Sequence, residues 1–341
     1  MTGFKTVGAR IRAVATHLPA APLTNEALAE AFEQSWSAER ILEKTGIKER
    51  RVAASDETAL DIAAGAVAAL FAAGHDPAQV DFLIFCSQAP DYILPSSACI
   101  LQERAGLPRT IGALDINGGC AGFVYGLSLA TGLIASGAAQ TVLLVTADTY
   151  SKYINPQDRS VRTLFGDGAA ATLVCADDMA TIGPFIFGTD GRGANSLIVE
   201  SGGARVPRGP ATAAEQADEF GNVRSRDNLF MDGGAVMSFT LREVPPAWAE
   251  LKRRAGLDDA DFDLVFLHQA NRFMLDALVR KLKLDPAKVP YFFENIGNTV
   301  ASSIPFALED AMAGGRLTAG TCVGLVGFGV GLSWAGCVAR F

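Results

Sequence analysis

The chain of 341 residues is long enough for two ordinary domains or one large domain with a substantial core. Its composition, with 49% hydrophobic and 19% charged residues, is that of a folded globular protein and excludes a disordered chain. A net charge of −8 argues against a general nucleic-acid-binding protein or a protein that binds anionic membranes.

The N-terminal segment has charged residues scattered among apolar ones and lacks the long apolar core of a secretory signal. No stretch approaches the roughly 20 uninterrupted apolar residues of a membrane-spanning helix. We therefore expect a soluble, cytoplasmic protein. The six cysteines have no regular spacing, so we expect neither a metal site nor a disulfide framework; they are Cys86, Cys99, Cys120, Cys175, Cys322 and Cys337.

Cys120 has the most unusual surroundings of the six. The run TIGALDI (residues 110–116) predicts a strand, Gly118 and Gly119 predict a tight turn, and apolar residues at helical spacing follow from Ala121. Cys120 would then lie at the N-terminus of a helix, where the peptide dipoles favour a thiolate. The competing interpretation is a buried core cysteine, which we expect for most of the others.

The segment 202–228 lacks periodicity and predicts a surface loop or insertion. His268 follows the apolar strand DLVFL and precedes an amphipathic helix, a position where α/β sheets hold their sites. His17 and His75 fit solvated loops better. Asn298, in NIGNTV, is either a turn residue or an amide donor, and its own surroundings leave both possibilities open.

The chain also resembles itself, because residues 73–89 and 255–270 share five identities at an offset of 182 residues. Both halves read as helix, buried strand, helix and closing strands, which predicts an α/β fold. We expect duplicated halves, residues 1–178 and 179–341, joined near residues 176–182. Packing about a pseudo-twofold axis would bring Cys120, His268 and Asn298 into one site.

Several motifs then resemble the β-ketoacyl-acyl-carrier-protein synthase III group of the thiolase superfamily. They run in order along the chain: TGIKERR, PSSACILQ, NGGCAGF, DRSVRTLFGDGAAA, HQAN, GNTVASS and GFGVGLSWAG. The resemblance implies a thiolase-like fold with two α/β halves in five layers, α-β-α-β-α. It implies an acyltransferase of fatty-acid biosynthesis that uses thioesters of coenzyme A or acyl-carrier protein and holds no bound cofactor or metal.

In that family the matching cysteine accepts an acyl group, and an enolate formed by decarboxylation of a malonyl thioester attacks it. The resemblance assigns these roles to Cys120 as nucleophile and to His268 and Asn298 as donors to the enolate oxygen. A second oxyanion site would use the N–H groups of Cys120 and Val330. Relatives usually carry glycine at the position of Val330. Phe328 matches the aromatic residue beside the histidine.

The positions that hold coenzyme A match less well. Arg40 and Lys44 stand where relatives carry Trp and Arg, so the usual aromatic clamp is missing from these positions, while Arg159 and Asn271 are retained. The resemblance implies that a basic helix docks the carrier protein and that Leu94 reaches the acyl pocket of a partner in a homodimer. The basic residues are Arg272, Arg280, Lys281 and Lys283.

Two other functions stay open at this point. The first is an acyltransferase that passes the acyl group from Cys120 to an alcohol or amine acceptor. The second is a non-catalytic subunit of a heterodimer, against which the retention of Cys120, His268 and Asn298 argues.

Overall fold

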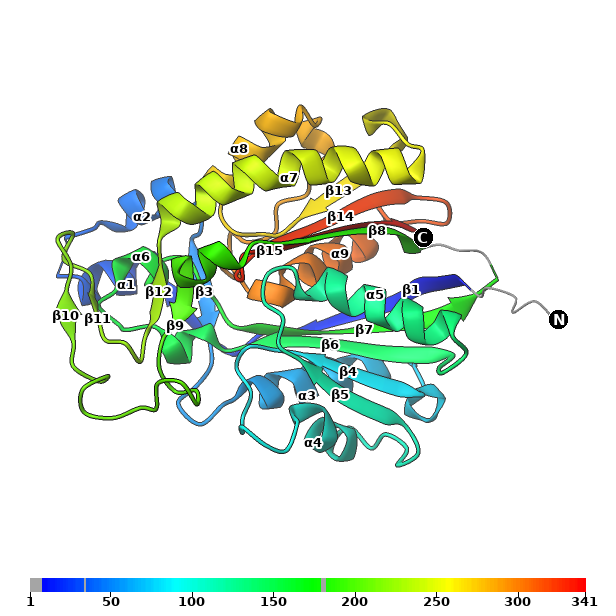
Figure 1. Cartoon of the computed structure of the whole chain (residues 1–341), viewed down its shortest axis with the longest axis horizontal. Helices are drawn as coiled ribbons and strands as arrows, with labels where there is room; N and C mark the ends of the chain where they lie inside the picture. The colour runs from blue at the N-terminus through cyan, green and yellow to red at the C-terminus, as the bar shows by residue number, and fades with distance from the viewer. Residues whose placement is uncertain (1–7, 34, 179–181) are drawn as a thin grey trace.

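Two β-sheets form the framework of the structure, a computed structural model that describes residues 8–33, 35–178 and 182–341 (Figure 1). The first sheet has the order β1-β7-β6-β4-β5, with the bounds Gly8–His17, Gly168–Asp177, Thr141–Asp148, Phe82–Cys86 and Gly112–Ile116. The second has the order β13-β14-β15-β8, with the bounds Leu264–Leu267, Cys322–Gly329, Ser333–Arg340 and Ile182–Thr189.

Helices cover both faces of each sheet and produce five layers (Figure 1). The outer layer on the first sheet is α3 (Ala59–Ala72) with α4 (Ser97–Arg104), and the outer layer on the second is α7 (Gly233–Ala255) with α8 (Arg272–Leu282). Between the sheets lie α5 (Gly122–Ala135) and α9 (Ser303–Ala313), which contact strands of both. The predicted five-layered α/β arrangement is confirmed.

The two sheets repeat one topology. Strand β4 pairs parallel with β6, which pairs antiparallel with β7; likewise β13 pairs parallel with β14, which pairs antiparallel with β15. The similar segments 73–89 and 255–270 also fold alike, because each follows a helix with a 3₁₀ turn and a parallel strand. In the first these are α3, Pro77–Gln79 and β4, and in the second α7, Asp259–Asp261 and β13. The boundary at residues 178 and 179 remains a prediction, since 179–181 lie outside the described residues.

Burial on both faces explains the sequence of the central strands. From Val142 to Asp148 every residue of β6 is buried, because α3 covers one face of the sheet and α5 the other. Such strands read as continuous apolar runs instead of alternating patterns. Among the helices that the structure describes, none has the length and apolar character needed to cross a membrane.

Smaller elements gather at one end of the molecule, on the left in Figure 1. Two strand pairs and three short helices lie there: β2 (Ala21–Thr24) with β3 (Glu49–Val52), β9 (Leu197–Val199) with β12 (Leu229–Met231), α1 (Asn25–Ala31), α2 (Ala38–Thr45) and α6 (Arg159–Arg162). The predicted loop 202–228 is largely irregular, but it contains a short hairpin of β10 (Gln216–Ala217) and β11 (Val223–Arg224). Pairing of two residues per strand is too short to leave a periodic signal in the sequence.

Candidate active site

Cys120 lies in the turn that leads into α5 and is 4% exposed. Helix α5 begins at Gly122 and its N-cap residue, Ala121, makes no side-chain capping bond. No side chain therefore caps the first turn of the helix, although the Gly122 N–H donates to the Gly119 carbonyl at 2.6 Å. The predicted position of Cys120 at a helix start is thus found in the structure.

The end of β14 packs directly on this turn. A Cβ atom on Gly329 would lie 2.6 Å from the Cys120 sulfur, and one on Gly327 would lie 2.7 Å from the Ala121 Cα. Both positions therefore require glycine because the two backbones approach so closely. This approach brings the backbone N–H of Val330 to the Cys120 sulfur, which also receives the N–H of Cys120 itself.

Burial of the Cys120 sulfur opposes the expected thiolate. Burial raises the pKa of Cys120 to about 12, with a further rise from Asp148, and the hydrogen bonds from Val330 and Cys120 only partly oppose it. Loss of water around the sulfur thus favours the neutral thiol, in contrast to the thiolate expected from the helix start.

This pKa predicts how Cys120 reacts with iodoacetamide. The thiolate is the nucleophile, so the alkylation rate should rise about tenfold per pH unit between about pH 7 and 10 without levelling off. The rate should be measured from the mass of the Cys120 adduct. Cys99, which is exposed, serves as the internal comparison and should be alkylated faster than the buried Cys120. A plateau for Cys120 below about pH 8 would contradict the prediction.

His268 directly follows β13 and is 2% exposed. Its Nδ1 lies 2.7 Å from the Ser303 hydroxyl, which accepts the backbone N–H of Gln269 at 3.3 Å. This network assigns the His268 tautomer: the Ser303 O–H donates to Nδ1, so the ring proton is on Nε2. Burial lowers the pKa of His268 to about 3, so the ring is neutral at physiological pH. It is therefore a hydrogen-bond donor and not a cation.

Asn298 is held in one orientation just before the 3₁₀ turn Val300–Ser302 that leads into α9. Its Oδ1 accepts the N–H of Val300 at 3.0 Å, and its backbone N–H donates to Leu164 at 2.9 Å. Val300 has a φ of 54°, a strained value for a β-branched residue. Because Oδ1 is engaged, the amide NH₂ is the group left to donate. Both predicted roles, turn residue and donor, are compatible with this geometry.

Cys120, His268 and Asn298 line one cavity of about 290 Å³, so the structure brings the three together. The Phe328 ring also lines it and meets the His268 ring edge-on, with centroids 5.6 Å apart. Sequence reasoning assigned no role to Ser303, which ends the motif GNTVASS and contacts His268 across 35 residues. Among the described residues no group of His, Cys, Asp and Glu side chains is arranged to hold a metal ion.

The outer part of the cavity is lined by residues of α2, α6, α7 and α8, including the predicted Lys44, Arg159 and Asn271. It also contains Trp36, which precedes α2 and which motif matching missed. The Arg40 guanidinium and the Lys44 ammonium lie over the Trp36 ring, at 5.1 and 5.4 Å from its centroid. An aromatic surface is therefore present, but Trp36 provides it four residues before Arg40, the position where relatives carry Trp. Arg40 packs against it and lies on the adjacent surface.

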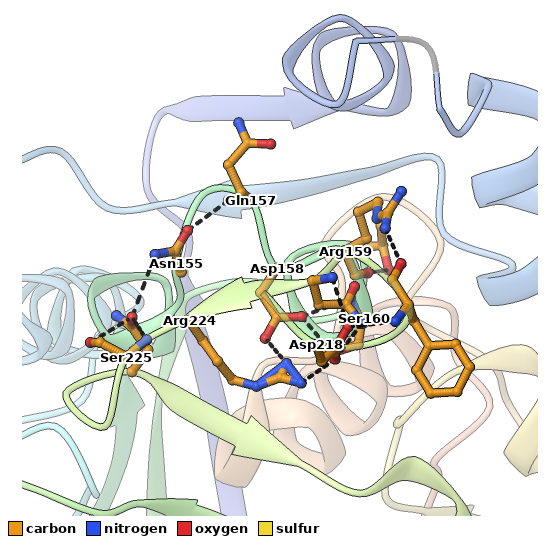
Figure 2. Close-up of polar contacts among 12 residues, drawn as sticks. Asn155, Gln157, Asp158, Arg159, Ser160, Asp218, Arg224 and Ser225 are labelled. Carbon is orange, nitrogen blue, oxygen red and sulfur yellow. Dashed lines mark hydrogen bonds and ion pairs between the residues drawn. The ribbon is translucent and has the colours of Figure 1, made fainter. Parts of the chain in front are cut away.

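Figure 2 shows how the segment 202–228 is attached to α6, whose Arg159 and Ser160 line the cavity. Arg224 pairs with Asp158 at 3.0 Å and with Asp218 at 2.5 Å, and Asp158 caps α6 through the N–H of Ser160. The Arg159 guanidinium donates to the Phe220 carbonyl. The hairpin thus fixes the helix that carries Arg159.

The remaining predicted residues lie outside the cavity. The basic side chains of α8 and its C-cap are exposed, and Arg272 also pairs with Glu294 at 3.6 Å; they are Arg272, Arg280, Lys281 and Lys283. Leu94 is 80% exposed in the segment before α4. Val330 is half-buried, and its side chain lines a second surface hollow of about 420 Å³ on the other side of the Cys120 turn.

This architecture, two repeated α/β halves with a cysteine at the start of a central helix, defines a thiolase-superfamily enzyme. Two family models match: 3-oxoacyl-[acyl-carrier-protein] synthase III over residues 114–191, and its C-terminal model over residues 253–341. Among curated proteins, β-ketoacyl-[acyl-carrier-protein] synthase III of Roseiflexus castenholzii is 38% identical over 95% of both chains. The Chlamydia caviae protein of that name is 36% identical over 97% of this chain and 96% of its own.

Solved structures give the same result. A 3-oxoacyl-(acyl-carrier-protein) synthase III is 55% identical, with a TM-score of 0.96 over 98% of this chain and 100% of the other. The Pseudomonas aeruginosa enzyme is 30% identical, with a TM-score of 0.84 over 98% of both chains. The chain belongs to the β-ketoacyl-acyl-carrier-protein synthase III family and is an enzyme of the acyltransferase class.

Proposed function

We propose that the protein condenses an acyl thioester with malonyl-acyl-carrier protein, with release of CO₂, through an acyl-enzyme on Cys120. The observation that carries the proposal is one cavity lined by a thiol, a neutral imidazole and an oriented amide. The curated relatives are named for this condensation and do not favour acyl transfer to an alcohol or amine. We also propose a role in fatty-acid biosynthesis in the cytoplasm.

In the first half-reaction the Cys120 sulfur loses its proton and attacks the thioester carbonyl. The N–H groups of Cys120 and Val330 bind the oxygen as it becomes negative, and the carrier thiol leaves. The thiol pKa of about 12 means that the reactive thiolate is a minor species at neutral pH. The proton therefore leaves Cys120 as the bond to carbon forms and ends on the departing carrier sulfur, and the product is a neutral thioester that suits a buried site.

In the second half-reaction the malonyl group loses CO₂ and leaves an enolate, whose oxygen carries the negative charge. His268 donates from Nε2 and Asn298 donates from its NH₂ to this oxygen. A neutral, buried imidazole binds the anion without giving up its proton, so the enolate carbon stays available to attack the acyl group on Cys120. The carbon–carbon bond forms, and the Cys120 sulfur leaves with the electron pair and takes up a proton from water, which restores the thiol.

Assay of the purified protein with labelled malonyl-acyl-carrier protein and a panel of acyl thioesters tests the function. CO₂ release and a ketoacyl product on the carrier protein are expected together. An acyl-enzyme that transfers to alcohols or amines without CO₂ release would support the alternative acyltransferase. A protein that forms no acyl-enzyme at all would fit the non-catalytic subunit.

The entrance is proposed to accept coenzyme A as well as carrier-protein thioesters. Trp36, Arg40 and Lys44 supply an aromatic face and positive charge for a nucleotide, and the four basic residues of α8 supply a surface complementary to an acidic carrier protein. These two features are separate, so variants can distinguish them.

Trp36→Ala should raise the KM for an acyl-coenzyme A donor by about tenfold, the loss expected for one stacked base, and leave the KM for malonyl-carrier protein unchanged. The double variant Arg280→Glu, Lys281→Glu should do the reverse, because charge reversal weakens docking of an acidic partner. Steady-state kinetics with each substrate varied in turn measures both effects. Equal changes in both KM values for either variant would contradict this division.

We also propose a homodimer. Tyr92, Ile93 and Leu94 are 60%, 93% and 80% exposed in the chain, and β5 is the last strand of its sheet with one edge unpaired by the described strands. Exposed apolar segments beside an open sheet edge indicate a protein interface, and here a second copy would cover both. Sedimentation equilibrium should give twice the chain mass, and Ile93→Arg with Leu94→Arg should lower it. A monomer at micromolar concentration would refute the proposal.

A further inference from the structure

Two consecutive serines lie at the start of α9, and neither takes part in the bond changes of the proposed mechanism. Ser302 ends the 3₁₀ turn Val300–Ser302 that follows Asn298, and Ser303 is the first residue of the helix. Their exposed fractions are 0% and 1%. A hydroxyl group buried this deeply needs hydrogen-bond partners, so the partners of the two serines indicate what each side chain does.

The Ser303 hydroxyl group fixes which ring nitrogen of His268 can donate. Its Oγ accepts the Gln269 N–H at 3.3 Å and lies 2.7 Å from Nδ1 of His268. Because a backbone N–H can only donate, this chain of hydrogen bonds runs in one direction, toward the ring, and leaves the ring proton on Nε2. A hydroxyl group, unlike a carboxylate, carries no charge, so Ser303 orients the ring without favouring its protonation.

The Ser302 hydroxyl group binds the sheet of the other half. Its Oγ lies 2.8 Å from the Thr146 hydroxyl, 3.0 Å from the Thr146 carbonyl and 3.2 Å from the Gly168 carbonyl. Because the two carbonyls only accept, the Ser302 proton points toward them and the Thr146 hydroxyl donates to Ser302. Thr146 belongs to β6 and Gly168 begins β7. Ser302 thus ties the turn after Asn298 to two strands of the first sheet.

The backbone of this turn is strained and therefore depends on such restraints. Val300, between Asn298 and Ser302, has a φ of 54°, a conformation that persists only where surrounding contacts enforce it. The Val300 N–H is also the donor that holds Asn298 Oδ1, at 3.0 Å. Relaxation of Val300 would therefore release the Asn298 amide. Ser302 acts on Asn298 by this route, through the backbone of the turn.

We propose that Ser302 and Ser303 are positioning residues, which aim the Asn298 amide and the His268 Nε2–H at one oxygen of the enolate. This inference rests on the proposed function, since it deepens the account of the same site. The two serines are adjacent in the chain, so one helix start fixes both donors relative to each other. Donors that are fixed before the reaction stabilise a developing charge better than donors that must be ordered during it.

The first test compares the two half-reactions in the full-length protein. Ser302→Ala and Ser303→Ala should each slow CO₂ release from malonyl-acyl-carrier protein by about tenfold, because each removes one buried hydrogen-bonding group behind a donor. Acylation of Cys120, followed by intact mass, should keep its wild-type rate in both variants. A selective loss of CO₂ release is the expected signature of misplaced donors.

The second test observes the His268 ring without any substrate. The chain has only three histidines, so the ¹⁵N NMR signals of His268 in histidine-labelled protein can be identified by their loss in His268→Ala. The wild-type ring should carry its proton on Nε2, and Ser303→Ala should add a population with the proton on Nδ1. Ser302→Ala should leave the tautomer unchanged, because Ser302 acts on Asn298.

Ser97→Ala is the matched control. Ser97 is also a serine of 1% exposure at the first position of a helix, α4, but it lies outside the set of residues that line the cavity. Its loss should change neither half-reaction nor the His268 signals.

Three results would overturn the inference: a wild-type His268 ring with its proton on Nδ1, unchanged CO₂ release in the two alanine variants, or an equal loss of acylation and CO₂ release in them. The last would show a general disturbance of the fold in place of misplaced donors. Absence of CO₂ release from the wild-type protein would instead refute the proposed function, while the NMR measurement would still decide the role of Ser303.

Discussion

Cys120→Ala should reduce formation of the ketoacyl product at least about 10³-fold, because the two-step route through an acyl-enzyme is then closed. The acyl adduct should disappear from the intact mass in parallel. CO₂ release from malonyl-acyl-carrier protein should persist, since the donors His268 and Asn298 remain in the cavity. Product formation and CO₂ release, measured on the same sample, separate these two steps.

Cys99→Ala provides the control for this prediction. Cys99 is an exposed cysteine on α4, so its loss should change neither acylation nor condensation. Condensation by Cys120→Ala at more than about a tenth of the wild-type rate would refute Cys120 as the nucleophile. Transfer of the acyl adduct to Cys99 in the wild-type protein would do the same.

His268→Ala and Asn298→Ala should each lower the rate of decarboxylation by about 10² to 10³-fold, the loss typical of one oxyanion donor. Acylation of Cys120 should change little, because it uses backbone N–H groups of Cys120 and Val330. The contrast between a retained acyl adduct and a lost CO₂ signal is the expected signature. His75→Ala, in the loop after α3, is the control histidine variant.

The neutral state of the His268 imidazole predicts how decarboxylation responds to pH. A lowered pKa of about 3 means that His268 stays uncharged at every pH above that value, so its protonation should not limit decarboxylation between about pH 5 and 8. Decarboxylation that falls on going from about pH 5 to 8 would indicate a protonated histidine and contradict this assignment. Loss of acylation together with decarboxylation in both variants would contradict the division of roles.

The arrangement around Cys120 follows from local pattern. A strand, two glycines and a helical run predict a cysteine at a helix start, and an apolar strand before His268 predicts the end of a sheet. Self-similarity between segments 182 residues apart predicts that the halves repeat. The strand, turn and helix signals are encoded by neighbouring residues, so periodicity and turn chemistry detect them.

Other properties depend on contacts between distant segments. The raised pKa of Cys120 comes from water exclusion by both halves, and the ring tautomer of His268 comes from Ser303 on α9. Trp36 enters the cavity through the path of the chain before α2, four residues from the position that motif matching examined. Burial and long-range hydrogen bonding leave no periodic signal in a single sequence, so these features required coordinates.

The pairing of β4 with β6 and of β13 with β14 has a consequence for the origin of the chemistry. Each repeat contributes a helix start to the cavity, α5 behind Cys120 and α9 behind Asn298, yet the two have diverged into opposite roles. In the proposed function, one supplies the sulfur that is acylated, and the other supplies the groups that bind the enolate oxygen. Neither repeat holds the complete proposed site, because the cavity is lined by side chains of both.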